Sequence, residues 1–564
     1  MKTCSKLKTR CKFTTTHRLN LTMKKIFIIF SFLLFTSVFA QNDTLTNKPV
    51  SLLKIPYTHF DYNDIEASFS DSIHSAIKPL HYFEINPNIL RKKYADLMLP
   101  KKTWLGRKLF NENMFNITGE DYWISIDPVV DLRLGKDNQT QEKYLFQNTR
   151  ALRVEGGLGK QFVFSATIAE NWARYPVFLD RYAWVTRPAI IPGFGLNKSE
   201  NKRFVDYPYA AGYFAYKPSK FFFFELGHGS HFIGEGYHSL FLSDNAGVSP
   251  YFKVEATFWK VKYTTMWTAY QDMRPEVSDE GVFRKKFSAI HYIDWNALPK
   301  LNLGFFETVV WHNTNRRGFD VNFLNPLIFF KTAEYEAGSN GSNTILGFSA
   351  RYKLPLKLQM YTQFVLDEMT ISKFFGDPGY RHNKYGVQLG IKYHDAFGVP
   401  NLFLRAEYNK VRPYTYGHGN VLTNYGHNYQ SLAHPWGANF EESIMEIQYR
   451  KGRFFAHNTF IIGKKGFDFP SDTLAYGGDI YHYGASNIHR ENNYTLQGNL
   501  GQLAFNKFEA GYIVNPVTNL KLFGGFIYRK TSIEQPTKTV KNETSKYIYF
   551  GIKTHLWNDH YDVF

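Results

Sequence analysis

The sequence predicts an all-β transmembrane barrel of about 18 antiparallel strands with a short N-terminal helical, plug-like region. Two observations lead to this fold class. Aromatic residues make up 18% of the 564 residues, with 52 Phe and 38 Tyr, while the mean hydropathy is only −0.36. Long stretches also alternate between apolar and polar side chains. A membrane barrel combines these properties, because each strand turns one face to lipid and the other to a polar lumen, and aromatic rings gather at the membrane interfaces.

The alternation is clear in two segments, 401–412 and 440–450, which flank a long polar loop. In the first segment, Leu404 and Ala406 lie on either side of Arg405. Successive side chains of a strand point to opposite faces, so each segment has one apolar face and one face with charges of both signs. These two segments therefore predict neighbouring strands of the barrel wall.

The same reading extends over most of the chain. It gives eighteen segments, at 122–134, 144–158, 161–171, 205–216, 221–229, 251–258, 261–271, 287–296, 301–312, 344–354, 356–369, 384–394, 401–412, 440–450, 453–463, 503–514, 519–530 and 546–557. Short connections follow the even strands and long ones follow the odd strands, as expected when short turns face the periplasm. The count treats 313–343 and 464–502 as loops, which fixes it to within two.

Residues 1–40 predict an N-terminal extension followed by a secretory signal peptide. Lys24 and Lys25 precede an apolar run that ends at Ala40, the pattern of a signal peptide cleaved after that residue. We therefore expect export to the outer membrane. The two cysteines, Cys4 and Cys11, lie before the cleavage point, which excludes disulfides and cysteine-based metal sites from the mature barrel.

The region 41–118 predicts a polar leader and a small helical region on the periplasmic side or a plug. Apolar residues recur at three- and four-residue spacing in 65–77 and 88–98, and the segment 104–110 follows the same pattern. This spacing indicates short helices. The outer-membrane barrel is then expected over 119–564.

Charge and motifs exclude several functions. The formal net charge is +18, of which eight charges lie within residues 1–40, where no acidic residue occurs, so +10 remains for the rest. Basic residues form no cluster of the kind that nucleic-acid binding needs, and no nucleic-acid partner is expected. No nucleophile elbow, His-Glu-x-x-His, Walker loop or dinucleotide fingerprint occurs. We therefore predict no enzyme activity, no catalytic residues and no cofactor.

The loop between the strands 401–412 and 440–450 holds the candidate ligand-binding residues. Its aromatic rings can stack on sugars and its amides can bond hydroxyl groups, so a glycan site is predicted there, with an acidic residue expected at the lumen mouth. The candidate set is Tyr414, Tyr416, His418, Tyr425, His427, Tyr429, Trp436 and Glu235. The alternative is an interfacial girdle, since Tyr and Trp gather there in any membrane protein.

A metal site in this loop is not predicted. His418, His427 and His434 are separated by nine and seven residues, which matches no zinc pattern. We expect these histidines to pack against the neighbouring tyrosines.

Several segments resemble the capsule-assembly (Wzi-like) outer-membrane proteins. The resemblance lies in the run Phe-Ile-Gly-Glu-Gly-Tyr-His-Ser-Leu-Phe-Leu-Ser-Asp-Asn-Ala at 232–246, in Tyr-Thr-Gln-Phe-Val-Leu-Asp at 361–367, and in Glu407-Tyr408 leading to 414–418. From about residue 73 onward the chain is more similar to the gliding-motility proteins of the RemB type. The segments 104–110, 427–439 and 561–564 carry that closer resemblance.

The resemblance implies a function and partners. Wzi-like proteins are lectin-like barrels with a helical plug that hold surface polysaccharide, and RemB-type proteins belong to gliding Bacteroidota. It implies outer-membrane lipid, surface polysaccharide and the gliding-motility machinery as partners. The alternative is a porin-like diffusion channel for small solutes. The sequence leaves open which glycan is bound, whether the barrel is open or plugged, and its oligomeric state.

Overall fold

The computed structural model describes residues 52–57, 62–69, 73–186, 188–199, 204–278, 280–313, 318–325, 341–482, 489, 491–554 and 556–564. The predicted extension, signal peptide and cleavage after Ala40 lie outside the described residues. Within the described ranges, no helix is long and apolar enough to cross a membrane.

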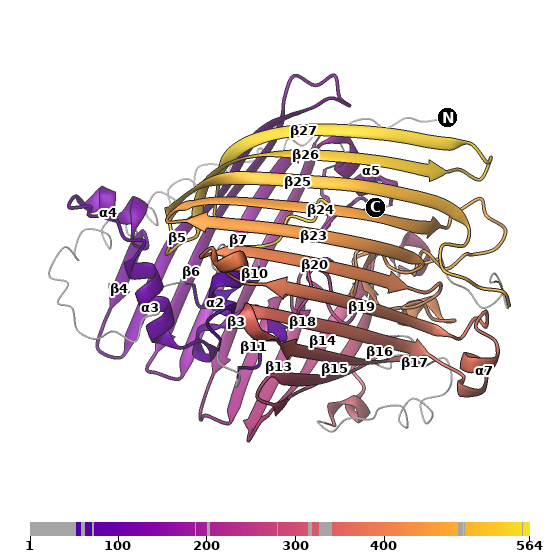
Figure 1. Cartoon of the computed structure of the whole chain (residues 1–564), viewed down its shortest axis with the longest axis horizontal. Coiled ribbons are helices and arrows are strands. Elements are labelled where there is room, and N and C mark those ends of the chain that lie inside the picture. The colour runs from indigo at the N-terminus through magenta and orange to yellow at the C-terminus, as the bar shows by residue number, and fades with distance from the viewer. Residues whose placement is uncertain are drawn as a thin grey trace, which may run out of the picture. The chain divides into compact units, whose positions relative to one another are not determined.

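Eighteen long strands of the described chain close into one antiparallel barrel (Figure 1). Strand β27 returns to β5 through the pairs from Tyr547 with Asp137 to Lys553 with Asp131. The strands are β5 (Tyr122–Asp137), β6 (Leu145–Leu158), β7 (Phe162–Arg174), β10 (Val205–Tyr216), β11 (Phe222–Gly229), β13 (Ser249–Phe258), β14 (Val261–Asp272), β15 (Arg284–Leu298), β16 (Leu301–His312), β17 (Ser342–Lys353), β18 (Leu358–Glu368), β19 (Lys384–Tyr393), β20 (Leu402–Val411), β23 (Phe440–Lys451), β24 (Phe454–Phe467), β25 (Asn499–Asn515), β26 (Leu520–Glu534) and β27 (Val540–Thr554). The predicted fold class is confirmed.

The wall differs from the prediction where its last strand, β27, pairs with β5 to close the barrel. Strand β27 was expected to run to residue 557, but it ends at Thr554 and its ladder with β5 stops at Lys553. A short strand, β4 (Phe115–Thr118), pairs with the next stretch of β5, from Trp123 to Ile126. Because β4 occupies that edge, the chain after β27 leaves the wall and turns inward. Strand β4 joins the wall although it precedes residue 119, the predicted start of the barrel.

Lipid-facing and luminal side chains separate as the alternation predicts. Apolar side chains on one row of each strand are exposed, for example Ile168 at 69% and Leu226 at 59%. Charged side chains on the other row are buried, and they form ion pairs such as Arg405 with Glu446 and Lys553 with Glu509. The lumen is therefore polar and well filled.

N-terminal segments lie at one end of the barrel, with the first of them inside the lumen and α4 outside the wall (Figure 1). They comprise β1 (Lys54–Ile55), α2 (Tyr62–Glu66), β2 (Ile77–Lys78), β3 (Leu80–His81), the 3₁₀ turn η1 (Tyr82–Glu84), α3 (Pro87–Ala95) and α4 (Trp104–Phe110). Side chains of Asn86 and Thr103 accept hydrogen bonds from the first turns of α3 and α4, as good N-caps do. The expected helix over 65–77 is not continuous, because Ile77 pairs as a strand with the loop after β11.

Ion pairs to the wall anchor these N-terminal segments. Lys54 lies 2.8 Å from Glu225 of β11, and Glu66 lies 2.7 Å from Lys392 of β19. The N-terminal segments thus fill the lumen near the short turns. The boundaries assigned to the leader and the barrel stay predictions.

Long connections fill the opposite end of the lumen. We name the segments 230–248, 412–439 and 556–564, together with 468–482, the luminal cap. Their buried side chains belong to one hydrophobic core with inward residues of the wall; for example, Phe241 stacks on Phe306 of β16 at 4.9 Å. The short elements of this end are α5 (Val177–Val185), β8 (Ile190–Ile191), β9 (Gly195–Leu196), β12 (Phe232–Ile233), η2 (Pro275–Val277), η3 (Val321–Leu324), α7 (Ile371–Gly376), η6 (Val421–Thr423), β21 (Gly426–His427) and β22 (Gln430–Ser431).

Two more 3₁₀ turns lie in the short connections, η4 (Pro355–Lys357) and η5 (Ala396–Gly398).

Candidate functional site

The predicted glycan-binding loop lies inside the luminal cap. Tyr414, Tyr416, Tyr425 and Trp436 are at most 2% exposed. The hydroxyl of Tyr416 donates to the backbone oxygen of Leu240 at 2.9 Å. In this arrangement none of the four rings offers a free face to a sugar, because the other cap segments cover them.

The remaining candidates also have partners within the protein. The His427 ring accepts a hydrogen bond from the backbone of Gln271 at 3.1 Å, and Tyr429 stacks on Tyr481 at 4.7 Å. His418 is half-buried and bonds the hydroxyl of Thr423. Burial lowers the pKa of His427 to about 3, so the ring is neutral.

Glu235 lies in the 230–248 segment of the cap and is buried. Its carboxylate lies 3.1 Å from both Arg351 and Lys392 and accepts a hydrogen bond from Ser75 at 2.9 Å. It therefore links the cap to the N-terminal segments and the wall. A ligand-binding role for the eight candidates stays a prediction.

One histidine of the loop joins a cluster that the sequence did not indicate. His434 Nε2 lies 2.8 Å from Glu442 Oε2, and His238 Nδ1 lies 3.0 Å from the same oxygen. His238 Nε2 lies 3.1 Å from a carboxylate oxygen of Asp562. The cluster joins three segments of the cap to Glu442, near the start of β23.

The hydrogen bonds of this cluster define its proton positions. His434 Nδ1 accepts the backbone N–H of Trp436 at 3.1 Å, so the neutral ring carries its proton on Nε2, toward Glu442. Burial lowers the pKa of His434 to about 4 despite Glu442. Burial opposes the charge on His238, but the carboxylates of Glu442 and Asp562 raise its pKa well above its usual range.

The trio of His238, His434 and Glu442 has the residue types of a metal site, and its ligand atoms lie within 4.8 Å of one another. A metal on His434 Nε2 would need the lone pair that the proton occupies. The geometry thus fits a buried ion-pair clamp, in which charged His238 bridges two carboxylates.

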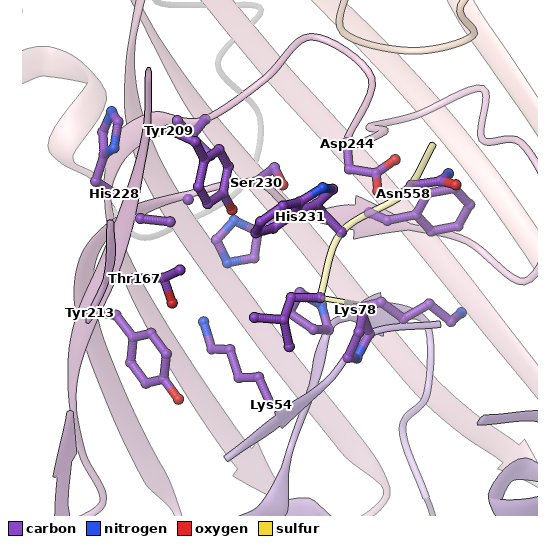
Figure 2. A pocket seen from close by; sticks show the side chains of 18 of the residues that line it. Lys54, Lys78, Thr167, Tyr209, Tyr213, His228, Ser230, His231, Asp244 and Asn558 are labelled. Atoms are coloured by element: carbon purple, nitrogen blue, oxygen red, sulfur yellow. The ribbon is translucent and has the colours of Figure 1, made fainter. Parts of the chain in front are cut away.

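A cavity of about 150 Å³ lies in the lumen beside β10 and β11. Figure 2 shows Tyr209 and His228 on the wall side and Lys54, Asp244 and Asn558 reaching in from inner segments. Its lining combines aromatic rings with hydroxyl, imidazole and amide groups, namely Tyr57, Phe194, Tyr209, Tyr213, Trp557, Thr167, Ser230, His228, His231 and Asn558.

Partners within the protein orient the side chains of this cavity. Tyr209 packs on Trp557 with ring centroids 4.8 Å apart. The Lys54 ammonium lies 3.9 Å above the ring of Tyr213. Burial lowers the pKa of His231 to about 4, so this ring is neutral. The lining thus combines apolar faces and neutral hydrogen-bonding groups with charged side chains. Lys54, Lys78 and Arg153 pair with Glu225, Glu235 and Glu155.

Sequence reasoning missed this cavity. Its local signal in the sequence is the run Gly-His-Gly-Ser-His at 227–231. The other lining residues come from many separate parts of the chain, among them β1, β7, β10 and the segment 556–564, which only the folded chain brings together.

The capsule assembly protein Wzi family matches residues 138–456 of the sequence. This chain belongs to that family. A solved structure with the same fold is Wzi of Escherichia coli, described as a carbohydrate-binding β-barrel involved in group 1 capsule assembly. It is 12% identical, with a TM-score of 0.54 over 90% of this chain and 100% of that chain. No curated protein matches the sequence.

Weaker similarity extends to proteins of Pseudomonas aeruginosa, among them the outer membrane protein OprD. OprD is 10% identical with a TM-score of 0.40 over 79% of this chain and 96% of its own. OpdL is 9% identical with a TM-score of 0.41 over 78% and 99%. Scores this low carry no argument about function. The family match and the closed barrel together show that this chain is an outer-membrane β-barrel.

Proposed function

We propose that this Wzi-family barrel binds or retains surface polysaccharide without converting it chemically. The observation that carries the proposal is the cavity beside β10. Tyr209, Tyr213 and Trp557 supply apolar ring faces, while Ser230 and Asn558 supply hydroxyl and amide groups. This combination suits a saccharide, whose C–H faces pack on rings and whose hydroxyl groups need donors and acceptors.

Two further points support binding over diffusion. The N-terminal segments and the luminal cap fill the two ends of the lumen and are held by buried ion pairs. The E. coli relative is described as carbohydrate-binding. A porin-like channel would need an open path through the N-terminal segments and the luminal cap.

A binding measurement tests the proposal. The probe is polysaccharide released from the surface of the producing cells, titrated into the purified barrel in detergent. We expect Tyr209→Ala to weaken binding roughly tenfold, since a buried ring contact contributes about 1 kcal/mol or more. Tyr144→Ala is the control, because Tyr144 is 51% exposed and lies outside the cavity. Equal binding by wild type and Tyr209→Ala would remove the cavity from the proposal.

Conductance in planar bilayers tests the alternative channel. A filled lumen predicts no stable large conductance. A steady, large single-channel current from the intact protein would favour the diffusion channel and contradict retention.

We extend the proposal to gliding motility on the resemblance to RemB-type proteins, with the gliding machinery as partner. Deletion of the gene should reduce the spreading of cells on agar. Normal spreading with reduced surface polysaccharide would keep the binding role and remove the motility role.

A further inference from the structure

The barrel wall is interrupted between β10 and β13. Strand β10 pairs with β7 along all its residues, from Val205 to Tyr216. On its other side it pairs with β11 only from Gly212 to Tyr216. The edge 205–211 of β10 therefore has no neighbouring strand in the described sheet. We name this interruption the lateral gap.

The gap arises because β11 is short. It ends at Gly229, and the chain then leaves the wall to fold into the lumen, where β12 pairs with β2. The next strand, β13, begins only at Ser249. The inward course of 230–248 that builds the luminal cap is thus the cause of the lateral gap.

Local contacts reduce the number of unpaired backbone groups on the edge of β10 that faces the gap. Alternate residues direct their backbone groups to the same side of a strand, so Asp206, Pro208 and Ala210 face the gap. The N–H of Asp206 donates to Asn197 Oδ1 at 2.9 Å, and its oxygen accepts from the backbone N–H of Lys198 at 2.7 Å.

The other two residues of this edge also limit unpaired polar groups. Pro208 has no N–H, and proline within sheets is found at such edges. The oxygen of Ala210 lies 2.8 Å from Nδ1 of His228, which therefore donates to it. An unpaired backbone N–H or C=O destabilises a protein in lipid. The contacts of these residues therefore allow β10 to border the gap with few such groups.

The lateral gap spans the outer edge of the lipid-facing band. Pro208 pairs with Glu170 of β7, Glu170 pairs with Arg150 of β6, and both charged side chains are exposed, so this part of the gap lies at a polar level. Ala210 pairs with Ile168 of β7, and Ile168 pairs with Leu152 of β6. The outward side chains of Ile168 and Leu152 are 69% and 52% exposed. The end of the gap at Ala210 therefore opens toward the membrane, and the rest of the gap opens toward the polar interface.

The cavity reaches this opening. In β11, Phe222 and Leu226 are exposed on the outward row, and His228 is exposed on the same row. Yet His228 also lines the luminal cavity, together with Lys54 and Asn558 (Figure 2). An outward side chain can line the lumen only where the wall ends. The cavity is thus continuous with the lateral gap.

We propose that the lateral gap admits the polar head of an acylated glycolipid from the membrane into the cavity, while its acyl chains stay in the lipid. This inference rests on the proposed saccharide binding and names its substrate class. The exposed side chains of Phe214, Leu226 and Ile168 surround the entrance with apolar surface. A cavity of about 150 Å³ has room for about one six-membered ring.

The test compares two probes. One is lipopolysaccharide from the outer membrane of the producing cells. The other is the same saccharide after mild acid hydrolysis has removed its acylated anchor. Each is titrated into the barrel in lipid nanodiscs. We expect the acylated form to bind at least about tenfold more tightly, because its anchor holds the head group at the entrance.

A substitution then closes the entrance. Ala210→Trp places an indole on the edge of the gap, and we expect it to abolish the preference for the acylated probe. Leu152→Trp is the matched control, because Leu152 lies in the same outward row on the intact wall, and it should leave both affinities unchanged. A photoreactive residue at Ser230 should cross-link to lipopolysaccharide in the control but not in Ala210→Trp.

The outcomes separate the two proposals. Equal binding of both probes, unaffected by Ala210→Trp, would overturn lateral entry and leave saccharide binding intact. Failure of wild type to bind either probe would overturn the proposed function and the lateral entrance with it.

Discussion

The luminal cap and the cavity beside β10 are built from the same kinds of side chain, but they differ in access. In the cap, Tyr416, Tyr425 and His434 are completely buried. In the cavity, Tyr209 is half-buried and His228 is exposed. The cap lies where several long connections converge, whereas the cavity lies where one short strand leaves the wall open. Tyr, His and amide side chains therefore identify a binding surface only when the fold leaves them uncovered.

Charge separates the two regions as well. In the histidine cluster of the cap, charged His238 bridges Glu442 and Asp562, so the cluster holds its carboxylates together around one shared cation. The cavity instead presents neutral groups such as His231 and Asn558 beside cations such as Lys54, which pairs with a carboxylate of the wall. The first arrangement holds segments together and the second can exchange hydrogen bonds with a ligand.

The largest expected effect comes from breaking the clamp of the cap. His238→Gln removes the charge and leaves the carboxylates of Glu442 and Asp562 buried without a counter-charge. We expect the free energy of unfolding to fall by about 3–5 kcal/mol, as when one partner of a buried pair is lost. Urea unfolding followed by tryptophan fluorescence measures this. His418→Gln is the control, and an equal loss in both variants would contradict a special role for His238.

Acidification should loosen the cap through His434. Its pKa in the folded protein is about 4, below its ordinary value of about 6.5, so the unfolded chain binds more protons between these pH values. Stability should therefore fall by roughly 3 kcal/mol as the pH drops from 6.5 to 4. The pKa of His238 is raised, so that residue stays charged throughout this window and adds no slope. The free energy of unfolding of His434→Gln should depend less on pH than that of the wild type. If its pH dependence is unchanged, His434 is not the source of the effect.

A pair of tyrosine substitutions should separate binding from stability. Tyr209→Ala should weaken polysaccharide binding roughly tenfold and leave the cap intact. Tyr416→Phe loses the hydrogen bond to Leu240 and should cost about 1 kcal/mol of stability without changing binding. Titration with polysaccharide and urea unfolding of both variants measure this. A binding defect in Tyr416→Phe alone would place the glycan site in the loop that follows β20 and not in the cavity.

The smallest effect concerns the free edge of the lateral gap. Pro208→Ala introduces an N–H at the polar end of the gap, beside exposed Glu170. Because water can bond this N–H, we expect stability to change by less than about 1 kcal/mol. The new amide should exchange rapidly with deuterium. Strong protection of that amide would indicate that a strand closes the gap.

The alternation of apolar and polar residues predicted most of the strands of the wall. The predicted ends of β10 at 205 and 216, and of β16 at 301 and 312, agree with the structure. This accuracy follows from the period of two, which each strand expresses within its own residues. The ends of β26 and β27 agree less well, because these strands continue as a polar hairpin to Glu534 and from Val540, where alternation is weak.

By itself, the sequence determined the barrel class, the strand number and the kinds of side chain available for binding saccharides. The tertiary structure alone decided which of them are covered. His238 and Asp562 meet although 324 positions separate them, and no local period reports such a contact. The lateral gap likewise depends on where one ladder stops, at Gly212 and His228. That point is set by the packing of 230–248 inside the lumen, because the chain cannot both extend the wall and fill the barrel.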